Sequence, residues 1–258
     1  MLRAKKSLGQ NFLHNKDTLE FIVEQLDLNR NETVVEIGGG TGNLTKYLLE
    51  LDDIDLKIVE IDDGLANKLK KISKDKAKII NKDILNFPLN FKENLILVGN
   101  IPYYITKPII KHIYRYHKYI KKAILMVQYE VAKSLTAAPS NKKYNAFTVF
   151  VKNFAEVKFL KKVNRGEFTP RPKVDSAVIS LNIKNKKNIF DSSNFIDFLF
   201  ICFRHKRKTL SNNLKKKYGK QNINNILKKN NINLKARAEE LPLDTFKLIY
   251  SELEKLEE

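Results

Sequence analysis

The sequence predicts an α/β fold in which a mostly parallel β-sheet is covered by helices on both faces. Five short segments rich in Ile, Leu and Val recur over about the first 130 residues, and each is followed by a stretch that can hold one helix. Continuous apolar strands alternating with helices are typical of a doubly wound sheet, because both of its faces are buried. Beyond residue 184 the periodicity is helical only. A smaller helical domain is therefore expected after the sheet.

The predicted elements follow in chain order. The five strands are TVVEIG (33–38), LKIVEID (56–62), KIIN (78–81), NLILVGN (94–100) and AILMVQ (123–128), with LTKYLLEL as the first helix between them. After residue 140, YNAFTVFVKNF favours a helix, and AEVKFLKKV and SAVISLNI favour two strands that pair as a hairpin at the sheet edge. The polar segment KNKKN (184–188) then divides the chain into domains 1–183 and 184–258.

Composition indicates a globular protein of a reducing compartment. At 258 residues and 43% apolar content, the chain is long enough for one sizeable core. The single cysteine, Cys202, excludes a disulfide framework and a multi-cysteine metal site, and the four histidines have no metal-ligand spacing, so no metal is expected. We find neither a signal peptide nor an apolar run of about 18 residues. A soluble, cytoplasmic protein is expected, although the basic start leaves import into an organelle open.

The positive charge is concentrated in one part of the chain. Residues 184–237 hold 15 Lys or Arg against two Asp, a balance of +13 out of the formal charge of +19. A field of this sign attracts polyanions, so nucleic acid is the first partner to consider. The alternative is a solvated surface that reflects a Lys- and Asn-rich composition.

Glycines and acids follow successive strands in the pattern of a nucleoside-binding crevice. Gly38, Gly39, Gly40 and Gly42 lie between the first strand and its helix, where glycine lets the backbone turn tightly and approach a ligand. Glu60 ends the second strand, 22 residues after Gly38, where an acid can accept ribose hydroxyls, and Asp83 ends the third. Alone, the glycines could serve a tight turn and each acid could be a helix N-cap or a solvated carboxylate.

The segment GNIPYYIT (99–106) selects the chemistry of that crevice. Pro102 fixes its own φ and holds Ile101 extended, so the backbone here is preset. Asn100 and nearby carbonyls can then direct oxygens at one spot beside the Tyr103 ring. Two acceptors next to an aromatic face suit a planar base that carries an exocyclic amine.

Several motifs together resemble a known family. NIPYYIT is similar to the Asn-Pro-Pro-Tyr class of motif of adenine-amino methyltransferases, and KKSLGQNFL, VEIGGGTGNLT, VEID, VQYEVA and FTPRPKVDSAV resemble the rRNA adenine dimethyltransferase family. FRHKRKTLSNNL and ARAEELPLDTF resemble its small-subunit KsgA type rather than the Erm resistance type. The resemblance covers nearly the whole chain. It implies the Rossmann-like class I methyltransferase fold with S-adenosylmethionine as cofactor. Tyr104 and Gly39 depart from the family's common Asn and Pro.

The resemblance also implies roles for individual residues. The cofactor contacts fall on Asn11, Leu13, Gly38, Glu60, Asp83 and Asn100, with Glu36 and Gly40 in the same loop. At the target base, Asn100 and a motif carbonyl would accept the hydrogens of the adenine amine, Tyr103 would stack on the ring and Phe168 would close its other face. The sulfonium methyl leaves a neutral thioether, so no general acid or base is assigned. Phe168 could instead be a core residue before a proline turn.

The basic segment is expected to bind RNA phosphates. Its candidate contacts are Arg204, Lys206, Arg207, Lys208, Lys215, Lys216 and Lys217. The resemblance implies that the target is two adjacent adenosines in a hairpin loop near the 3′ end of small-subunit rRNA, within a pre-formed small subunit. A monomer is expected. The alternatives are an Erm-type enzyme acting on large-subunit RNA, a DNA adenine methyltransferase, and a non-catalytic scaffold for pre-ribosomes or transcription.

Overall fold

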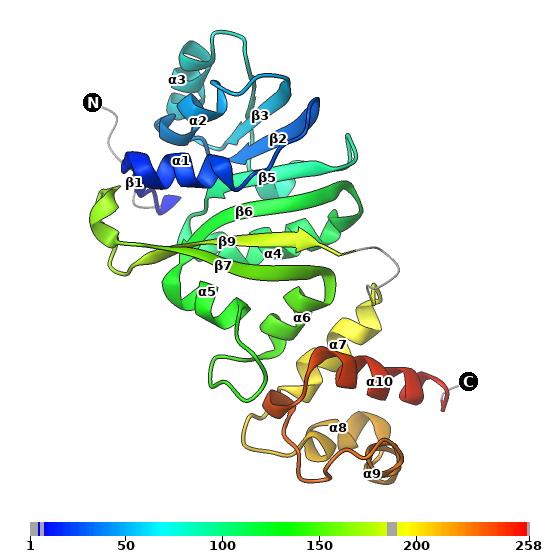
Figure 1. Cartoon of the computed structure of the whole chain (residues 1–258). Helices are drawn as coiled ribbons and strands as arrows, with labels where there is room; N and C mark the ends of the chain where they lie inside the picture. The colour runs from blue at the N-terminus through cyan, green and yellow to red at the C-terminus, as the bar shows by residue number, and fades with distance from the viewer. Residues whose placement is uncertain (1–4, 6–7, 185–189, 257–258) are drawn as a thin grey trace. The chain divides into compact units, whose positions relative to one another are not determined.

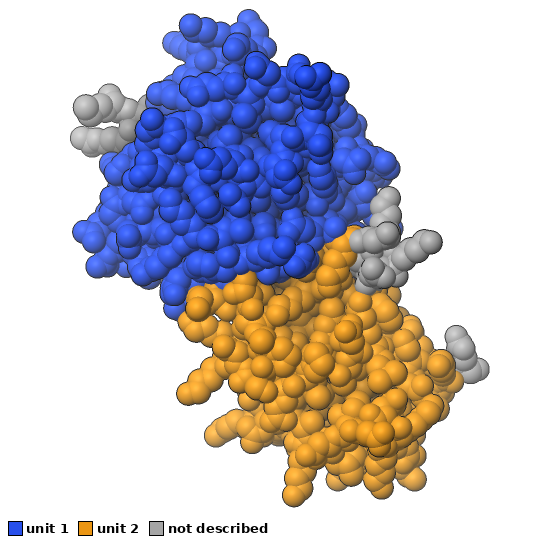
Figure 2. All heavy atoms as spheres, viewed as in Figure 1, with its two compact units in different colours: residues 1–132, 156–183 blue, residues 133–155, 184–258 orange. Residues whose placement is uncertain are grey.

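The computed structural model describes residues 5, 8–184 and 190–256 of the chain. The chain forms two compact units, coloured separately in Figure 2. The first unit comprises residues 1–132 and 156–183, and the second comprises residues 133–155 and 184–258. Residues 185–188 of the expected polar linker lie outside the described residues. No helix in the described part of the chain is long and apolar enough to cross a membrane.

The first unit is built on a seven-stranded sheet with the order β4-β3-β2-β5-β6-β9-β7. Its strands are β2 (Glu32–Ile37), β3 (Ile54–Glu60), β4 (Lys78–Asn81), β5 (Leu95–Asn100), β6 (Ile120–Gln128), β7 (Ala155–Val163) and β9 (Ser176–Ile183). The pairs from β4 to β6 are parallel, and β9 runs antiparallel to β6. The predicted doubly wound sheet with an edge hairpin is confirmed.

Helices cover both faces of this sheet. They are α1 (Lys16–Glu24), α2 (Asn43–Leu48), α3 (Asp63–Ser73) and α4 (Thr106–Arg115), and Figure 1 shows α1 and α4 on opposite faces. The helix α5 (Tyr129–Leu135) follows β6 and contains the division between the two units along the chain. Side-chain caps set where the helices begin. Asn15 accepts a hydrogen bond from the Thr18 amide at the start of α1, and Asp62 accepts one from the Leu65 amide at the start of α3.

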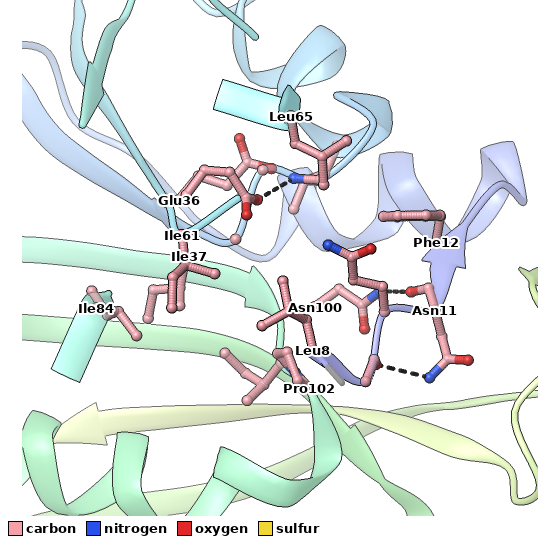
Figure 3. A pocket seen from close by; sticks show the side chains of 18 of the residues that line it. Leu8, Asn11, Phe12, Glu36, Ile37, Ile61, Leu65, Ile84, Asn100 and Pro102 are labelled. Carbon is pink, nitrogen blue, oxygen red and sulfur yellow. Dashed lines mark hydrogen bonds between the residues drawn. The ribbon is translucent and has the colours of Figure 1, made fainter. Parts of the chain in front are cut away.

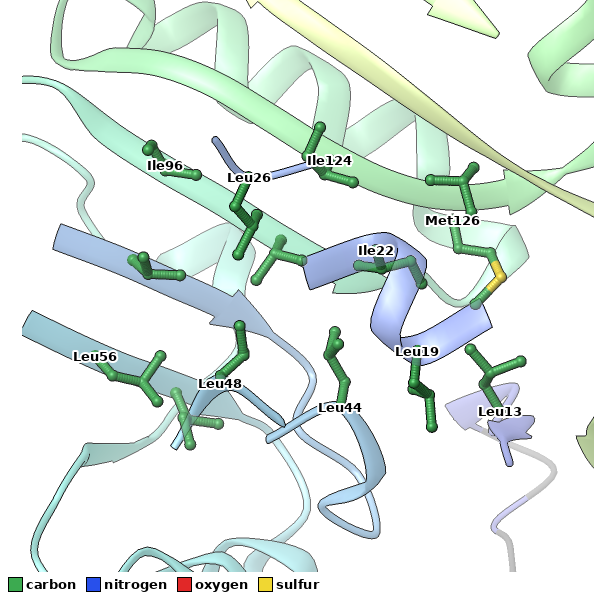
Figure 4. Close-up of a cluster of buried hydrophobic side chains, with 14 of the residues drawn as sticks. Leu13, Leu19, Ile22, Leu26, Leu44, Leu48, Leu56, Ile96, Ile124 and Met126 are labelled. Carbon is green, nitrogen blue, oxygen red and sulfur yellow. The ribbon is translucent and has the colours of Figure 1, made fainter. Parts of the chain in front are cut away.

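One core cluster of the first unit lies between α1, α2, α3 and the sheet. Leu26, Leu48, Ile58 and Ile96 are fully buried there, and Figure 4 shows their neighbours from the helices and the strands interleaved. Five residues of β2 in succession are almost inaccessible to solvent, as a parallel strand covered on both faces requires. The ends of these strands are thereby held in fixed positions for the site described below.

The second unit is helical. It contains α6 (Ala146–Phe154), α7 (Ser193–Cys202), α8 (Leu210–Tyr218), α9 (Lys220–Lys229) and α10 (Leu243–Glu254) around a core that includes Phe195, Phe198 and Phe246. Cys202 is fully buried in this core, as the apolar segment FLFICF predicts.

The second unit takes in residues 133–155, which the sequence boundary at 183/184 had placed with the sheet. The Tyr144 hydroxyl donates to the Leu241 carbonyl at 2.9 Å, and the Asn153 amide nitrogen donates to the Phe190 carbonyl at 2.9 Å. Val149 packs in the same core as the C-terminal helices. Residues 133–155 come before two strands of the sheet along the chain, so their position in the sequence does not indicate that they contact the C-terminal helices.

Candidate active site

A cavity in the first unit lies where β2, β3 and β5 end. Most of the predicted cofactor and target residues line it: Asn11, Leu13, Glu36, Gly38, Gly40, Glu60, Asp83, Asn100 and Tyr103. Figure 3 shows side chains from the N-terminal segment, the sheet ends and the segment after β5 converging on one space. This is the place at which open parallel sheets bind ligands.

The glycine loop between β2 and α2 forms one wall of the cavity. The Gly38 amide donates to the Val59 carbonyl at 2.8 Å, which ties the loop to β3. Gly38 has a φ of +74°, and a Cβ atom built at this position would meet no atom within 4 Å. The backbone at Gly38 therefore borders open space, with no side chain between the main chain and a ligand.

Glu60 is held at the end of β3 by two main-chain amides. Its carboxylate accepts hydrogen bonds from Gly40 at 2.8 Å and from Asp62 at 2.9 Å. Glu60 is 4% exposed, and this burial raises the pKa of Glu60, whereas the hydrogen bonds from the amides lower it. A carboxylate offers about four acceptor positions, so two amides leave capacity for further donors.

Two more acids border the cavity with different surroundings. Asp83 caps the 3₁₀ turn Ile84–Asn86 by accepting the Leu85 amide at 2.9 Å, which is the N-cap role that was the alternative for this residue. Glu36 is buried and accepts a hydrogen bond from the Thr45 hydroxyl at 2.7 Å. Burial raises the pKa of Glu36 to about 7; the Thr45 hydrogen bond lowers it and the nearby Glu60 charge raises it.

The segment after β5 carries the predicted target residues. The Asn100 side-chain nitrogen donates to the Asn11 carbonyl at 2.7 Å, so its oxygen is the atom left to accept hydrogens. The Ile101 amide donates to the Met126 carbonyl at 3.1 Å, and Pro102 has a φ of −55°. These bonds and the proline ring fix the turn, as the sequence indicates. The Tyr103 hydroxyl lies 2.6 Å from the Ser176 hydroxyl, and its ring is half-buried at the cavity wall.

The N-terminal segment closes another side of the cavity. The short strand β1 (Phe12–Leu13) pairs antiparallel with β8 (Phe168–Thr169), and the Asn43 side chain donates to the Leu13 carbonyl at 2.6 Å. Asn11 reaches Asn100 through its main-chain carbonyl, and its own side chain donates to the Gly9 carbonyl at 3.2 Å.

A family of known activity matches this chain. The model described as ribosomal RNA adenine dimethylase matches residues 1–255. The chain belongs to that family. The match confirms the predicted family, and with it the prediction of an enzyme that uses S-adenosylmethionine to methylate adenine in ribosomal RNA.

Full-length relatives agree with this family. "Ribosomal RNA small subunit methyltransferase A" of Mycoplasma mobile is 39% identical over 250 residues, covering 96% of this chain and 98% of the relative. The crystal structure of a dimethyladenosine transferase from Plasmodium falciparum matches with a TM-score of 0.80 at 28% identity, over 94% of this chain and 97% of that one. The 23S rRNA methyltransferase ErmE matches with a TM-score of 0.76 at 26% identity, over 94% and 99%.

Phe168 is the one predicted target residue that the structure does not bring to the cavity. Phe168 is 3% exposed and packs in the core of the first unit, in register with Leu13 across the β1–β8 pair. This placement agrees with the alternative role for Phe168, that of a core residue before a proline turn. Its stacking role stays a prediction.

Two residues that line the cavity were not predicted from the sequence. Phe12 lies so close to the glycine loop that a Cβ atom built on Gly40 would be 3.2 Å from its ring. Ile61, directly after Glu60, lines the cavity and is 48% exposed. The sequence offers one signal for Ile61, which is its place directly after the strand-ending acid. Phe12 lies in a segment without periodicity, and only its contact with the glycine loop reveals it.

The predicted RNA contacts all lie in the second unit and are all exposed. They are Arg204, Lys206, Arg207 and Lys208 between α7 and α8, and Lys215, Lys216 and Lys217 in the last turn of α8. None of these seven forms an ion pair with another described residue. The buried Asn213 side chain accepts the His205 amide at 3.1 Å and donates to the Cys202 and His205 carbonyls. The loop between α7 and α8, which carries four of the cations, is thus held by α8.

Proposed function

We propose that this enzyme transfers methyl groups from S-adenosylmethionine to the 6-amino group of two adjacent adenosines in a hairpin loop near the 3′ end of small-subunit rRNA. The observation that carries the proposal is the orientation of Asn100. Because its nitrogen is bound to the Asn11 carbonyl, its oxygen remains as an acceptor at the cavity, which Tyr103 also lines. An acceptor next to an aromatic face suits an exocyclic amine on a base.

The cavity has the features that a bound S-adenosylmethionine needs. Gly38 offers open backbone, and Glu60 retains acceptor capacity for ribose hydroxyls. Ile61 and Phe12 supply apolar surface for a base, and one carboxylate oxygen of Asp83 accepts no hydrogen bond from the described residues. When bound, the cofactor supplies a methyl group on a sulfonium that leaves as a neutral thioether.

The protein's own residues position the target amine. The Asn100 oxygen accepts one amine hydrogen. This hydrogen bond favours a lone pair that is localised on the nitrogen instead of delocalised into the ring, and it holds the nitrogen in place. Tyr103 stacks on the adenine, a contact worth about 1 to 3 kcal/mol, and this offsets part of the cost of unstacking the base. Each transfer first gives a positively charged nitrogen, which then releases one proton to solvent. After the first transfer the amine therefore keeps one hydrogen, and the same acceptor serves the second transfer once the amine has turned.

The assignment to the small subunit draws on the C-terminal motifs and on the names of the relatives. FRHKRKTLSNNL and ARAEELPLDTF are of the KsgA type, and the Mycoplasma mobile relative carries the name of a small-subunit methyltransferase. The seven exposed cations of the second unit would contact phosphates without reading sequence. The ErmE match keeps large-subunit RNA as the competing substrate.

The deciding experiment is transfer of labelled methyl groups to unmethylated small subunits, with naked large-subunit RNA and duplex DNA in parallel. We expect dimethyladenosine only on the small subunit, at two methyl groups per modified adenosine. Label on large-subunit RNA would assign the enzyme to the Erm type, and label on DNA would assign it to the DNA adenine methyltransferases. Binding without any methyl transfer would indicate a non-catalytic scaffold. We also propose a cytoplasmic monomer; light scattering after size exclusion checks the oligomeric state.

A further inference from the structure

The first unit contains a second hollow, which is linked to Tyr103 through Ser176 and Asp175. It measures about 580 Å³ and is lined by Tyr129, Glu130, Arg165, Arg171, Val174 and Asp175, among others. This volume falls within the about 300 to 1,000 Å³ that is usual for ligand sites. Ser176, whose hydroxyl lies 2.6 Å from that of Tyr103, directly follows Asp175 in the chain. The two sites are therefore joined through one hydrogen bond and one peptide bond.

The rim of this hollow presents two guanidinium groups. Arg165 is oriented by two hydrogen bonds: its amide donates to Asp175 at 3.2 Å, and its side chain donates to the Lys173 carbonyl at 3.3 Å. Arg171 is exposed and forms no ion pair within the described ranges. Arginine binds phosphate oxygens with a planar pair of donors.

One acid of the hollow has a lysine as its ion-pair partner. The Asp175 carboxylate pairs with Lys162 at 3.0 Å, and the Lys162 hydrogen bond holds the pKa of Asp175 below its usual value. Glu130 is the other acid on the rim. Val174 is 42% exposed and, with the Tyr129 ring, supplies apolar surface.

We propose that this hollow binds the nucleotide that adjoins the target adenosine on the same RNA strand. Arg171 and Arg165 contact its phosphate, and Tyr129 and Val174 contact its base. This inference rests on the proposed function, which places the target adenine at Tyr103. A base drawn out of its stack leaves its neighbours unstacked as well, and RNA-binding proteins hold such splayed nucleotides with aromatic and arginine side chains.

The test compares Arg171→Ala with Arg30→Ala in methyl transfer to unmethylated small subunits. Both arginines are exposed and both changes remove one positive charge, but Arg30 pairs with Asp53 next to the start of β2, at the opposite end of the strands. For Arg171→Ala we expect the KM for small subunits to rise about three- to tenfold, with kcat and the KM for S-adenosylmethionine unchanged. The slope of log affinity against log salt should fall by about 1. Arg30→Ala should behave as wild type.

A second measurement locates the nucleotide itself. A photoreactive nucleotide placed next to the target adenosine in the hairpin should crosslink to the peptides that contain Tyr129 or Val174. Equal KM values for the two variants, or crosslinks only to other peptides, would overturn the inference. Methyl transfer by the wild type to small subunits would still support the proposed function in that case. Absence of transfer by the wild type to every substrate would overturn both.

Discussion

The side-chain nitrogen of Asn100 donates a hydrogen bond of 2.7 Å to the main-chain carbonyl of Asn11, 89 residues away in the chain. An asparagine amide presents a donor at one end and an acceptor at the other. The Asn11 carbonyl takes the donor end, so the acceptor end is available to a target amine. The N-terminal segment thus sets the orientation of the residue on which transfer is proposed to depend.

Asn100→Ala should abolish methyl transfer. It removes the acceptor for the target amine, and loss of one such preorganised group costs about 100-fold or more in rate. Asn100→Asp tests the orientation separately, because a carboxylate cannot donate to the Asn11 carbonyl and would repel it. Single-turnover transfer to small subunits measures both variants. RNA binding by filter assay should remain near wild type in each, and a parallel loss of binding and transfer would contradict a role confined to chemistry.

Tyr103→Phe and Tyr103→Ala should have different effects. The Phe variant keeps the ring and loses the hydrogen bond with Ser176, worth about 1 kcal/mol, so kcat/KM should fall less than about tenfold. The Ala variant loses the stacking surface, worth about 1 to 3 kcal/mol, and should lose about 5- to 150-fold. Ser176→Ala is the matched control for the hydroxyl contact. Equal losses in the Phe and Ala variants would show that the hydroxyl, and not the ring, matters.

The sequence indicates those parts of the fold that depend on local pattern. β4 was predicted at its observed bounds, and the glycine loop and the strand-ending acids meet at the predicted crevice, because parallel strands end on one side of their sheet. The membership of α6 in the second unit depends on contacts such as that between Tyr144 and Leu241, about 100 positions apart. No local pattern encodes such a pairing.

In the candidate site, too, local sequence features could be predicted and long-range contacts could not. Residue types and spacing were sufficient to find Glu60 and Asn100, whereas their hydrogen-bond partners were not predictable. Glu60 spends part of its acceptor capacity on Gly40 and Asp62, and Asn100 is oriented by a carbonyl that any residue at position 11 would supply. Asn11 itself was found only through the family resemblance, because a contact made by a main-chain carbonyl does not depend on the residue type and cannot be inferred from it.

Glu36 should make the stability of the protein depend on pH. Its pKa is raised from 4.5 to about 7, so the folded state binds a proton that the unfolded state releases. The corresponding stabilisation is complete below about pH 4.5 and is lost as the pH rises through about 7, with a size on the order of 3 kcal/mol. Glu36→Gln should remove this part of the pH dependence. Urea unfolding at pH 5, 6, 7 and 8 measures it, with the exposed Glu50→Gln as control. Parallel curves for wild type and Glu36→Gln would contradict the burial argument.

Charge reversal in the loop between α7 and α8 should weaken RNA binding and reduce its salt dependence. The triple change of Arg204, Lys206 and Arg207 to Glu removes three exposed cations from a loop that Asn213 holds in place. Each lost phosphate contact lowers the slope of log affinity against log salt by about 0.7 to 0.9, so the slope should fall by about 2 to 3. Filter binding to small subunits across a salt series measures it.

The matched control for this triple change is reversal of Lys70, Lys71 and Lys74, three exposed lysines at the end of α3 in the first unit. It alters the net charge by the same amount, so any effect of overall charge on encounter appears in both variants. If the cations between α7 and α8 contact phosphates, the slope changes only in the first variant. An equal decrease in both would assign RNA binding to the general field of the protein instead of to this loop.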